Sequence, residues 1–153
     1  MKKFGKYIIF ALIAILIVVL VVVLKNKSLT KTDLDNDFGT IEYRNETQWG
    51  GATIITLSSN HELDYSREES GEEVTKKTLT DTEYNEFKEA LINSGITKLS
   101  KNIGKNSEEN SKVYAHETIS ISFLNGEKFE TSGYGIEEQE FRQVVDALVK
   151  SIN

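Results

Sequence analysis

Residues 118–129, TISISFLNGEKF, alternate apolar and polar side chains and then reverse direction at an Asn-Gly pair. Strict alternation is typical of a strand with one buried face, and Asn-Gly is a strong hairpin signal. A two-residue loop would set Ser122 opposite Phe129 and mix the two faces, because side chains alternate along each strand. The parity therefore predicts a three-residue loop, Leu124-Asn125-Gly126, with Gly126 as a bulge and Ile121 opposite Phe129.

Four earlier segments also have the composition of strands. Residues 38–44 and 61–67 alternate in the same way, 52–58 (ATIITLS) is rich in β-branched side chains, and 74–79 follows a polar stretch. Ser59-Asn60 predicts a tight hairpin turn, and a second turn is expected in 68–73 around Ser70-Gly71. With the strands on either side of Asn125-Gly126, this makes about six strands, mainly antiparallel.

Two segments have the periodicity of amphipathic helices. Thr80-Asp81-Thr82-Glu83 is a capping box, in which the Thr80 hydroxyl and the Glu83 carboxylate each accept the other residue's amide proton. Gly95 is placed to end that helix as a left-handed cap. The second helix is expected over 137–152, with Glu137 and Glu138 in its first turn. The apolar stripes are Tyr84, Phe87, Leu91 and Ile92 in the first helix, and Phe141, Val144, Val145, Leu148 and Ile152 in the second.

The order of four strands, a helix, two strands and a helix predicts an α+β domain over residues 38–153. We expect a mainly antiparallel sheet with both helices on one face. The length of this segment is enough for one hydrophobic core and not for two.

Residues 8–24 (IIFALIAILIVVLVVVL) contain no polar side chain and follow a basic tail, residues 1–7. A helix of this length spans about 25 Å, so the flanking Phe4 and Tyr7 are needed to reach the roughly 30 Å of a bilayer core. A cleaved signal peptide would have a shorter apolar region and a small-x-small site, and neither is present. We predict a transmembrane helix that is retained as an anchor.

Residues 25–37 (KNKSLTKTDLDND) are polar and lack periodicity, which predicts a flexible linker. The lysines on the two sides of the apolar run differ little in number. Because a short basic N-terminus usually stays in the cytoplasm, we expect the C-terminal domain on the extracytoplasmic side.

Charge and composition exclude several classes of protein. Three of the 18 basic residues precede the apolar run, which leaves 15 against all 24 acidic residues, a net charge of −9. Such a domain should repel nucleic acid, whose affinity for proteins comes largely from cationic contacts to phosphate. The chain has no cysteine, which excludes disulfides, thiolate nucleophiles and cysteine-ligated zinc.

We find no catalytic constellation and expect no cofactor. The two histidines, His61 and His116, fall on separate predicted strands without a nucleophile motif, and each is expected at a sheet edge. Adjacent acidic pairs, such as Glu137-Glu138, are expected to be solvated and therefore poor acid–base catalysts. No phosphate loop or dinucleotide fingerprint is present.

Asp33, Asp35 and Asp37 are the weak candidates for a metal site, because their spacing and the following Gly39 resemble the start of a calcium loop. The glycine comes one residue late, and Arg44 stands where an EF-hand has its bidentate glutamate. We therefore interpret these aspartates as the acidic end of the linker and predict no metal.

Trp49-Gly50-Gly51 is the candidate interaction site. The only tryptophan of the chain lies in a glycine loop, where a backbone can approach a partner and an indole can anchor it. We expect the indole to fold over the sheet edge into the core, and the alternative is an exposed anchor.

The alternating hairpins, the Thr80–Glu83 box and the closing helix resemble uncharacterised membrane-tethered or secreted domains of Gram-positive bacteria over about residues 38–152. The resemblance supports the fold and the compartment and implies no site residues. Our leading hypothesis is a non-catalytic binding module at the outer face of the membrane, contacting a protein or cell-envelope component through a sheet edge or the Trp49 loop. An inhibitor or immunity-type protein is one form of this. The alternatives are a subunit of a membrane complex assembled through residues 8–24, and a hydrolase that uses His116.

Overall fold

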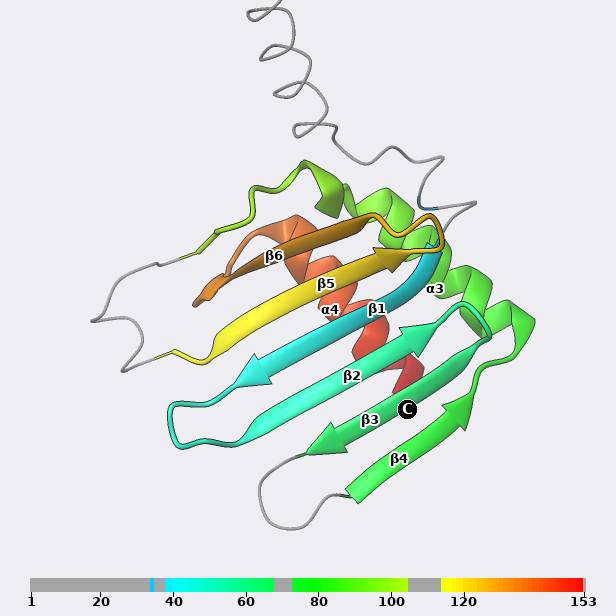
Figure 1. The fold of residues 1–153 in the computed structure, drawn as a ribbon, viewed down its shortest axis with the longest axis horizontal. Helices are drawn as coiled ribbons and strands as arrows, with labels where there is room; N and C mark the ends of the chain where they lie inside the picture. Colours follow the sequence, from blue (N-terminus) through cyan, green and yellow to red (C-terminus); the bar gives the residue numbers. More distant parts are fainter. Residues whose placement is uncertain (1–33, 35–37, 68–72, 105–113, 153) are drawn as a thin grey trace, which may run out of the picture.

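The computed structural model describes residues 34, 38–67, 73–104 and 114–152. They form one six-stranded antiparallel sheet with strand order β4-β3-β2-β1-β5-β6. The strands are β1 (Phe38–Glu46), β2 (Ala52–Ser58), β3 (Glu62–Arg67), β4 (Glu73–Thr78), β5 (His116–Phe123) and β6 (Lys128–Tyr134). The strands β1 to β4 follow one another as a meander, and the β5–β6 hairpin pairs with the other side of β1 (Figure 1).

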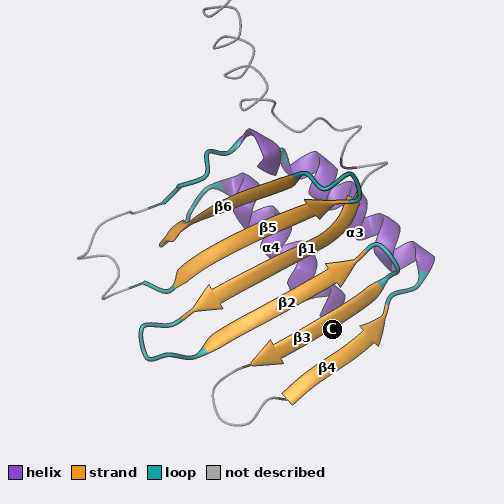
Figure 2. Cartoon of the chain, in the orientation of Figure 1, coloured by secondary structure: helices purple, strands orange, loops and turns teal. Residues whose placement is uncertain are grey.

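Two α-helices, α3 (Asp81–Ser94) and α4 (Gln139–Ile152), lie on the same face of the sheet, and a short 3₁₀ helix, η1 (Ile96–Lys98), follows α3 (Figure 2). The predicted α+β architecture is therefore confirmed. The helix α3 begins at the predicted capping box, and Gly95 ends it with φ of 72°. The helix α4 begins two residues later than predicted, so Glu137 and Glu138 precede its first turn.

The β5–β6 register places apolar side chains of the two strands on the same face of the sheet. Ile121 pairs with Phe129, as predicted, and Gly126 adopts a φ of 86° in a three-residue loop closed by the Gly126 N–H to Phe123 carbonyl bond. The turn at Ser59-Asn60 was predicted one residue too short. His61 belongs to the loop and takes the left-handed position that Gly126 occupies in the other hairpin, with φ of 71°. His61 is therefore a turn residue and not the first residue of a strand.

The core lies between the sheet and the two helices. Apolar residues of β1, β2 and β5, among them Ile41, Leu57 and Ile121, are buried against the stripes of α3 and α4. Leu34 is 3% exposed and belongs to the same core, although the sequence placed it in the linker. The chain is therefore fixed to the domain at Leu34, ahead of the predicted domain boundary at residue 38.

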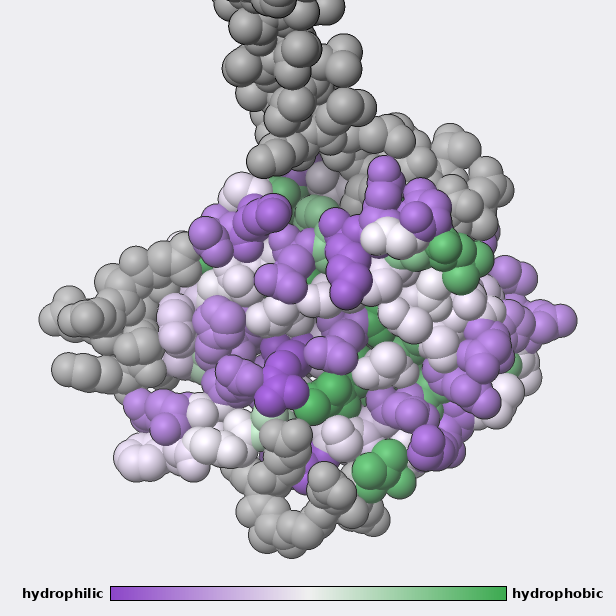
Figure 3. Space-filling model, viewed as in Figure 1, coloured by the Kyte–Doolittle hydropathy of each residue, from purple (hydrophilic) through white to green (hydrophobic). Residues whose placement is uncertain are grey.

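The opposite face of the sheet is polar. Neighbouring strands place Lys76, Asp64, Thr56, Glu42, Ser120 and Glu130 side by side across it. Figure 3 views this face and shows hydrophilic side chains with only small, separated apolar spots. Among the described residues, the part of this face that Figure 3 shows has no continuous apolar patch.

The described part of the chain contains no helix that is long and apolar enough to cross a membrane. The predicted span, residues 8–24, and the tail before it lie outside the described residues, as do most of the predicted linker and the expected turn at Ser70-Gly71.

Candidate interaction site at the β1–β2 hairpin

Trp49 lies at the tip of the hairpin that connects β1 to β2. The Thr47 N–H donates to the Gly51 carbonyl at 2.8 Å, and the Gly50 N–H donates to the Thr47 carbonyl at 3.1 Å. The Thr47 hydroxyl adds a bond to the Gly51 carbonyl at 3.2 Å, and Gly50 has a φ of 87°. These bonds give the loop the same three-residue form as the β5–β6 hairpin and fix its backbone.

The indole of Trp49 is 87% exposed. The expectation that it packs over the sheet edge was wrong, and the alternative of an exposed anchor is the one that the structure has. The reason lies in the turn, because its central residues project beyond the last cross-strand pair, Glu46 with Ala52.

The hairpin lies at the end of the sheet opposite to the one where the chain enters. β1 begins at the buried Phe38, near the right-hand end in Figure 1, and runs nine residues to Glu46 before the hairpin at the left. At about 3.3 Å per residue, this strand carries the tip roughly 30 Å from the start of the domain.

A groove of about 480 Å³ opens at the base of this hairpin, on the helix side of the sheet. Its floor is formed by side chains of β1, β2 and β3, and its wall by the outer residues of α4. No lining residue carries a charge, although 27% of the chain is charged. The lining residues are Tyr43, Asn45, Thr53, Ile55, Tyr65, Val145, Val149 and Ile152.

A buried polar network lies beside the groove. The Tyr43 hydroxyl donates to Glu117 Oε1 at 2.6 Å, and Arg142 Nη2 of α4 donates to Glu117 Oε2 at 2.5 Å. The amide of Asn45 donates to the Tyr43 hydroxyl at 3.1 Å. Burial and the hydrogen bond to the Glu117 carboxylate raise the pKa of Tyr43 above its ordinary value, so this phenol remains a donor at neutral pH.

The sequence analysis did not find this network, although a signal was present. Glu117 shares its phase with Ile119, Ile121 and Phe123, so a carboxylate stands on the apolar side of β5. A carboxylate on the buried face of a strand needs a partner of opposite charge. In this domain that partner is Arg142, which is next to the core residue Phe141 in α4.

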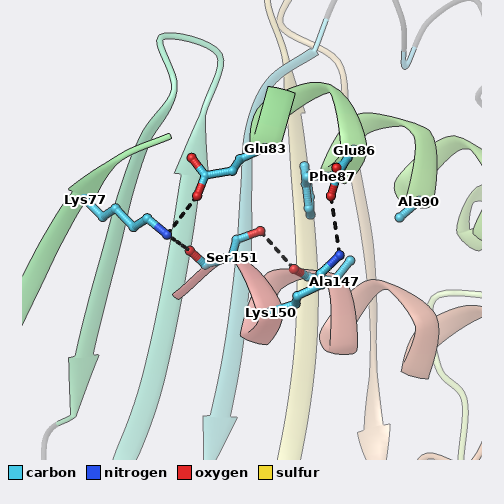
Figure 4. A pocket seen from close by; sticks show the side chains of 8 residues that line it. All are labelled: Lys77, Glu83, Glu86, Phe87, Ala90, Ala147, Lys150 and Ser151. Atoms are coloured by element: carbon cyan, nitrogen blue, oxygen red, sulfur yellow. Dashed lines mark hydrogen bonds and ion pairs between the residues drawn. The ribbon is translucent and has the colours of Figure 1, made fainter. Parts of the chain in front are cut away.

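A second, smaller pocket of about 200 Å³ lies between β4, α3 and α4 (Figure 4). Lys77 Nζ is 3.1 Å from Glu83 Oε1 and donates to the Ser151 carbonyl at 3.0 Å. Lys150 and Glu86 form an ion pair of 3.4 Å at the same place. Its charged side chains are thus engaged with one another, and Lys77 joins the edge strand to the start of α3 and the end of α4.

The two histidines lie at opposite ends of the sheet. The His61 ring stacks on Tyr84 with centroids 4.0 Å apart, and its Nδ1 is 3.5 Å from Asp81 Oδ1. His116 pairs with Glu46 at the hairpin end and lies against the Tyr134 ring. The structure therefore does not bring the histidines together, and neither has a hydroxyl hydrogen bond within the described residues.

The weak metal candidates Asp33, Asp35 and Asp37 lie outside the described residues. Within residues 34, 38–67, 73–104 and 114–152, no three His, Cys, Asp or Glu side chains are grouped so as to hold a metal ion.

The fold and the hairpin together define a small α+β domain that presents one aromatic side chain at its tip. Compared with known protein families and with curated proteins, the chain shows no match. Its function is therefore argued from the site itself.

Proposed function

We propose that this protein is a membrane-anchored, non-catalytic binding module whose β1–β2 hairpin contacts a protein or cell-envelope component on the extracytoplasmic side. The observation that carries the proposal is the 87% exposure of Trp49 on a hydrogen-bonded turn. Tryptophan is among the residues that contribute most to binding at interfaces, and a fixed loop loses little entropy when it binds.

The two edges of the sheet are less suited to binding than the hairpin. The outer edge of β6 is partly occupied, because at Ser132 the N–H donates to the Lys101 carbonyl and the carbonyl accepts from the Ile103 N–H. The outer edge of β4 carries Lys76 and the inward-pointing Lys77, a pattern that opposes the addition of another strand. Of the two contact regions expected from the sequence, the Trp49 loop is therefore the stronger candidate.

We base the membrane anchor in this proposal on the apolar segment of residues 8–24. Between Leu24 and the buried Leu34 there are nine residues, which span at most about 32 Å even when fully extended. The domain is then held close to the bilayer. The chain enters the domain at the end of the sheet opposite to Trp49, so the hairpin lies at the end of the sheet farthest from the point of attachment.

An inhibitor or immunity-type protein is one form of this proposal, since such proteins bind a partner without chemistry. In a membrane complex, residues 8–24 would instead make the essential contact. Replacing residues 8–24 by an unrelated transmembrane segment separates the two, because a binding module keeps its partners and a helix-assembled subunit loses them.

The test is crosslinking in intact cells followed by purification of the full-length protein and identification of the bound partners. We expect Trp49→Ala to lose partners that the wild type captures. Leu124→Ala is the matched control, because Leu124 is 69% exposed in the equivalent loop of the β5–β6 hairpin, at the other end of the sheet. If Trp49→Ala and Leu124→Ala both capture the same partners as the wild type, the hairpin is not the contact site.

A further inference from the structure

We propose that the partner of the Trp49 hairpin is an uncharged glycan chain of the cell envelope, bound by a group of aromatic side chains that includes Trp49. This inference rests on the proposed function and names the chemical class of its partner. It is carried by three further aromatic residues beside the hairpin. Together with Trp49 they form what we call the aromatic rim: Trp49, Tyr114, His116 and Tyr134.

The aromatic rim is assembled from three segments of the chain. His116, the first residue of β5, pairs with Glu46 at the end of β1 and with Tyr134 at the end of β6. The β1–β2 hairpin continues from Glu46 to Trp49, and Tyr114 comes two residues before His116. Figure 1 shows the hairpin, the start of β5 and the end of β6 at the same end of the sheet. The four aromatic residues therefore gather there, although they are far apart in the sequence.

Local contacts hold the residues of the rim in place. The rings of His116 and Tyr134 have centroids 4.8 Å apart and an interplanar angle of 59°. The Tyr114 ring lies against the backbone of Gly135, because a Cβ atom at that glycine would be 3.1 Å from two of the ring carbons. Trp49 is carried by the hydrogen-bonded turn. A surface fixed in this way loses little conformational entropy when it binds a ligand.

The rim places accessible rings beside strong hydrogen-bonding groups. Trp49 is 87% exposed and Tyr114 is 37% exposed. The other two members of the rim are partly exposed on the polar face of the sheet. On the same face, the Arg44 guanidinium donates through Nε to the Glu46 carboxylate. A ligand at the rim therefore meets aromatic rings and an ion pair together.

A sugar chain has the complementary chemistry. A pyranose ring presents C–H groups on its faces and hydroxyls around its edge. The C–H groups are attracted to the electron-rich face of an aromatic ring. The hydroxyls can donate to Glu46 and accept from Arg44 or from the indole N–H. Because these hydroxyls replace the water around the ion pair, its charged groups keep hydrogen-bond partners when the ligand binds.

Two other kinds of partner suit the rim less well. An apolar protein surface would have to cover the ion pair of Arg44 with Glu46, and burying charged groups without new partners is costly. Protein interfaces also have an apolar core, whereas the described part of this face in Figure 3 shows only separated apolar spots. An anionic polymer would be repelled, because 15 basic and 24 acidic residues after the apolar run give a net charge of −9. A neutral glycan meets neither obstacle.

The first experiment uses the fluorescence of Trp49, the only tryptophan of the chain. Full-length protein is kept in a detergent without a sugar headgroup, because a glucoside or maltoside would compete. It is titrated with oligomers of N-acetylglucosamine and, separately, with oligomers of β-linked glucose. We expect a saturable blue shift and reduced acrylamide quenching with at least one neutral series, and no change with polygalacturonate, an anionic glycan. Unchanged emission with both neutral series would overturn the proposal.

Variants of the rim make the test specific, with binding of the same oligomers measured by calorimetry. Trp49→Ala should weaken binding at least about thirty-fold, the effect of losing one strong hot spot. Tyr134→Ala should weaken it about three- to ten-fold, whereas Tyr134→Phe keeps the ring and should bind as the wild type does.

Leu124→Ala is the control, because Leu124 is 69% exposed in the β5–β6 loop at the other end of the sheet. Circular dichroism establishes that each variant is folded. If Tyr134→Ala binds as tightly as Leu124→Ala, the rim is not the binding surface.

Comparison with the capture of partners in cells separates this inference from the proposed function. If no neutral oligomer binds while Trp49→Ala still loses protein partners that the wild type captures, the hairpin contacts a protein and only the glycan is refuted. If neither oligomer binding nor capture in cells depends on Trp49, both the glycan and the hairpin contact are refuted.

Discussion

The buried network at the hairpin end gives the sharpest test of how this domain is stabilised. We expect Arg142→Met to destabilise the domain, because it leaves the Glu117 carboxylate buried with the Tyr43 hydroxyl as its only donor from the network. Removing one partner of a fully buried ion pair costs about 3–5 kcal/mol.

Two features of the structure lower that figure here. The side chain of Arg142 is 36% exposed, so solvent screens part of the interaction, and Glu117 keeps one strong hydrogen bond. We therefore expect a loss of about 2–3 kcal/mol in the free energy of unfolding. For a domain of this size, that lowers the midpoint of thermal unfolding by roughly 8–15 °C.

The assay is thermal unfolding of the full-length protein, followed by circular dichroism at pH 7. Lys150→Met is the matched control on the same helix, because the ion pair of Lys150 with Glu86 is exposed and should contribute less than about 0.5 kcal/mol. The double variant Glu117→Gln, Arg142→Met should recover at least half of the loss, since it removes the unpaired charge. A loss in Arg142→Met no larger than in Lys150→Met would refute the reasoning.

Two further predictions concern the ends of elements. Hydrogen bonds from the Thr80 backbone and hydroxyl, together with the Lys77 ion pair, lower the pKa of Glu83 to about 2 in the folded state. The ionised Glu83 carboxylate therefore stabilises the folded state at pH values above its pKa in the unfolded chain. This stabilisation is lost as the pH falls from about 4.5 to about 2. Glu83→Gln keeps the capping box and should lack that part of the acid dependence in unfolding curves recorded from pH 7 to pH 2. His61 has a left-handed φ of 71°. The His61→Gly variant should therefore be more stable than the His61→Ala variant by about 1 kcal/mol in chemical denaturation. Equal stability of the two variants would contradict a strained turn.

The fold could be predicted from the sequence because its signals are local and agree with one another. The alternation in residues 118–129 defined both the hairpin and its register, and the Thr80–Glu83 box defined the start of α3. The errors have physical reasons. His61 was assigned to a strand because residues 61–67 alternate apolar and polar side chains, whereas the three-residue turn needs a left-handed residue at this position. The His61 ring stacks on Tyr84.

Leu34 could not be placed from the sequence, because a single leucine among polar residues has no periodicity. Its burial depends on the core that 38–152 forms, so it is a tertiary contact. The exposure of Trp49 was misjudged for the opposite reason. Composition favours a buried tryptophan, whereas the three-residue turn places the side chain beyond the last strand pair.

The groove is the least predictable part of the candidate site, because it is built from the consecutive strands β1 to β3 and from α4, which is far from them in the sequence. The ion pair of Arg142 with Glu117 lies beside this uncharged groove and is linked to it by hydrogen bonds. Arg142 and the Tyr43 hydroxyl each donate a hydrogen bond to the Glu117 carboxylate. The Asn45 amide, which lines the groove, donates to the Tyr43 hydroxyl. A buried ion pair adds little net stability when it is compared with apolar packing. In this domain its hydrogen bonds hold the Tyr43 hydroxyl and the Asn45 amide in one arrangement.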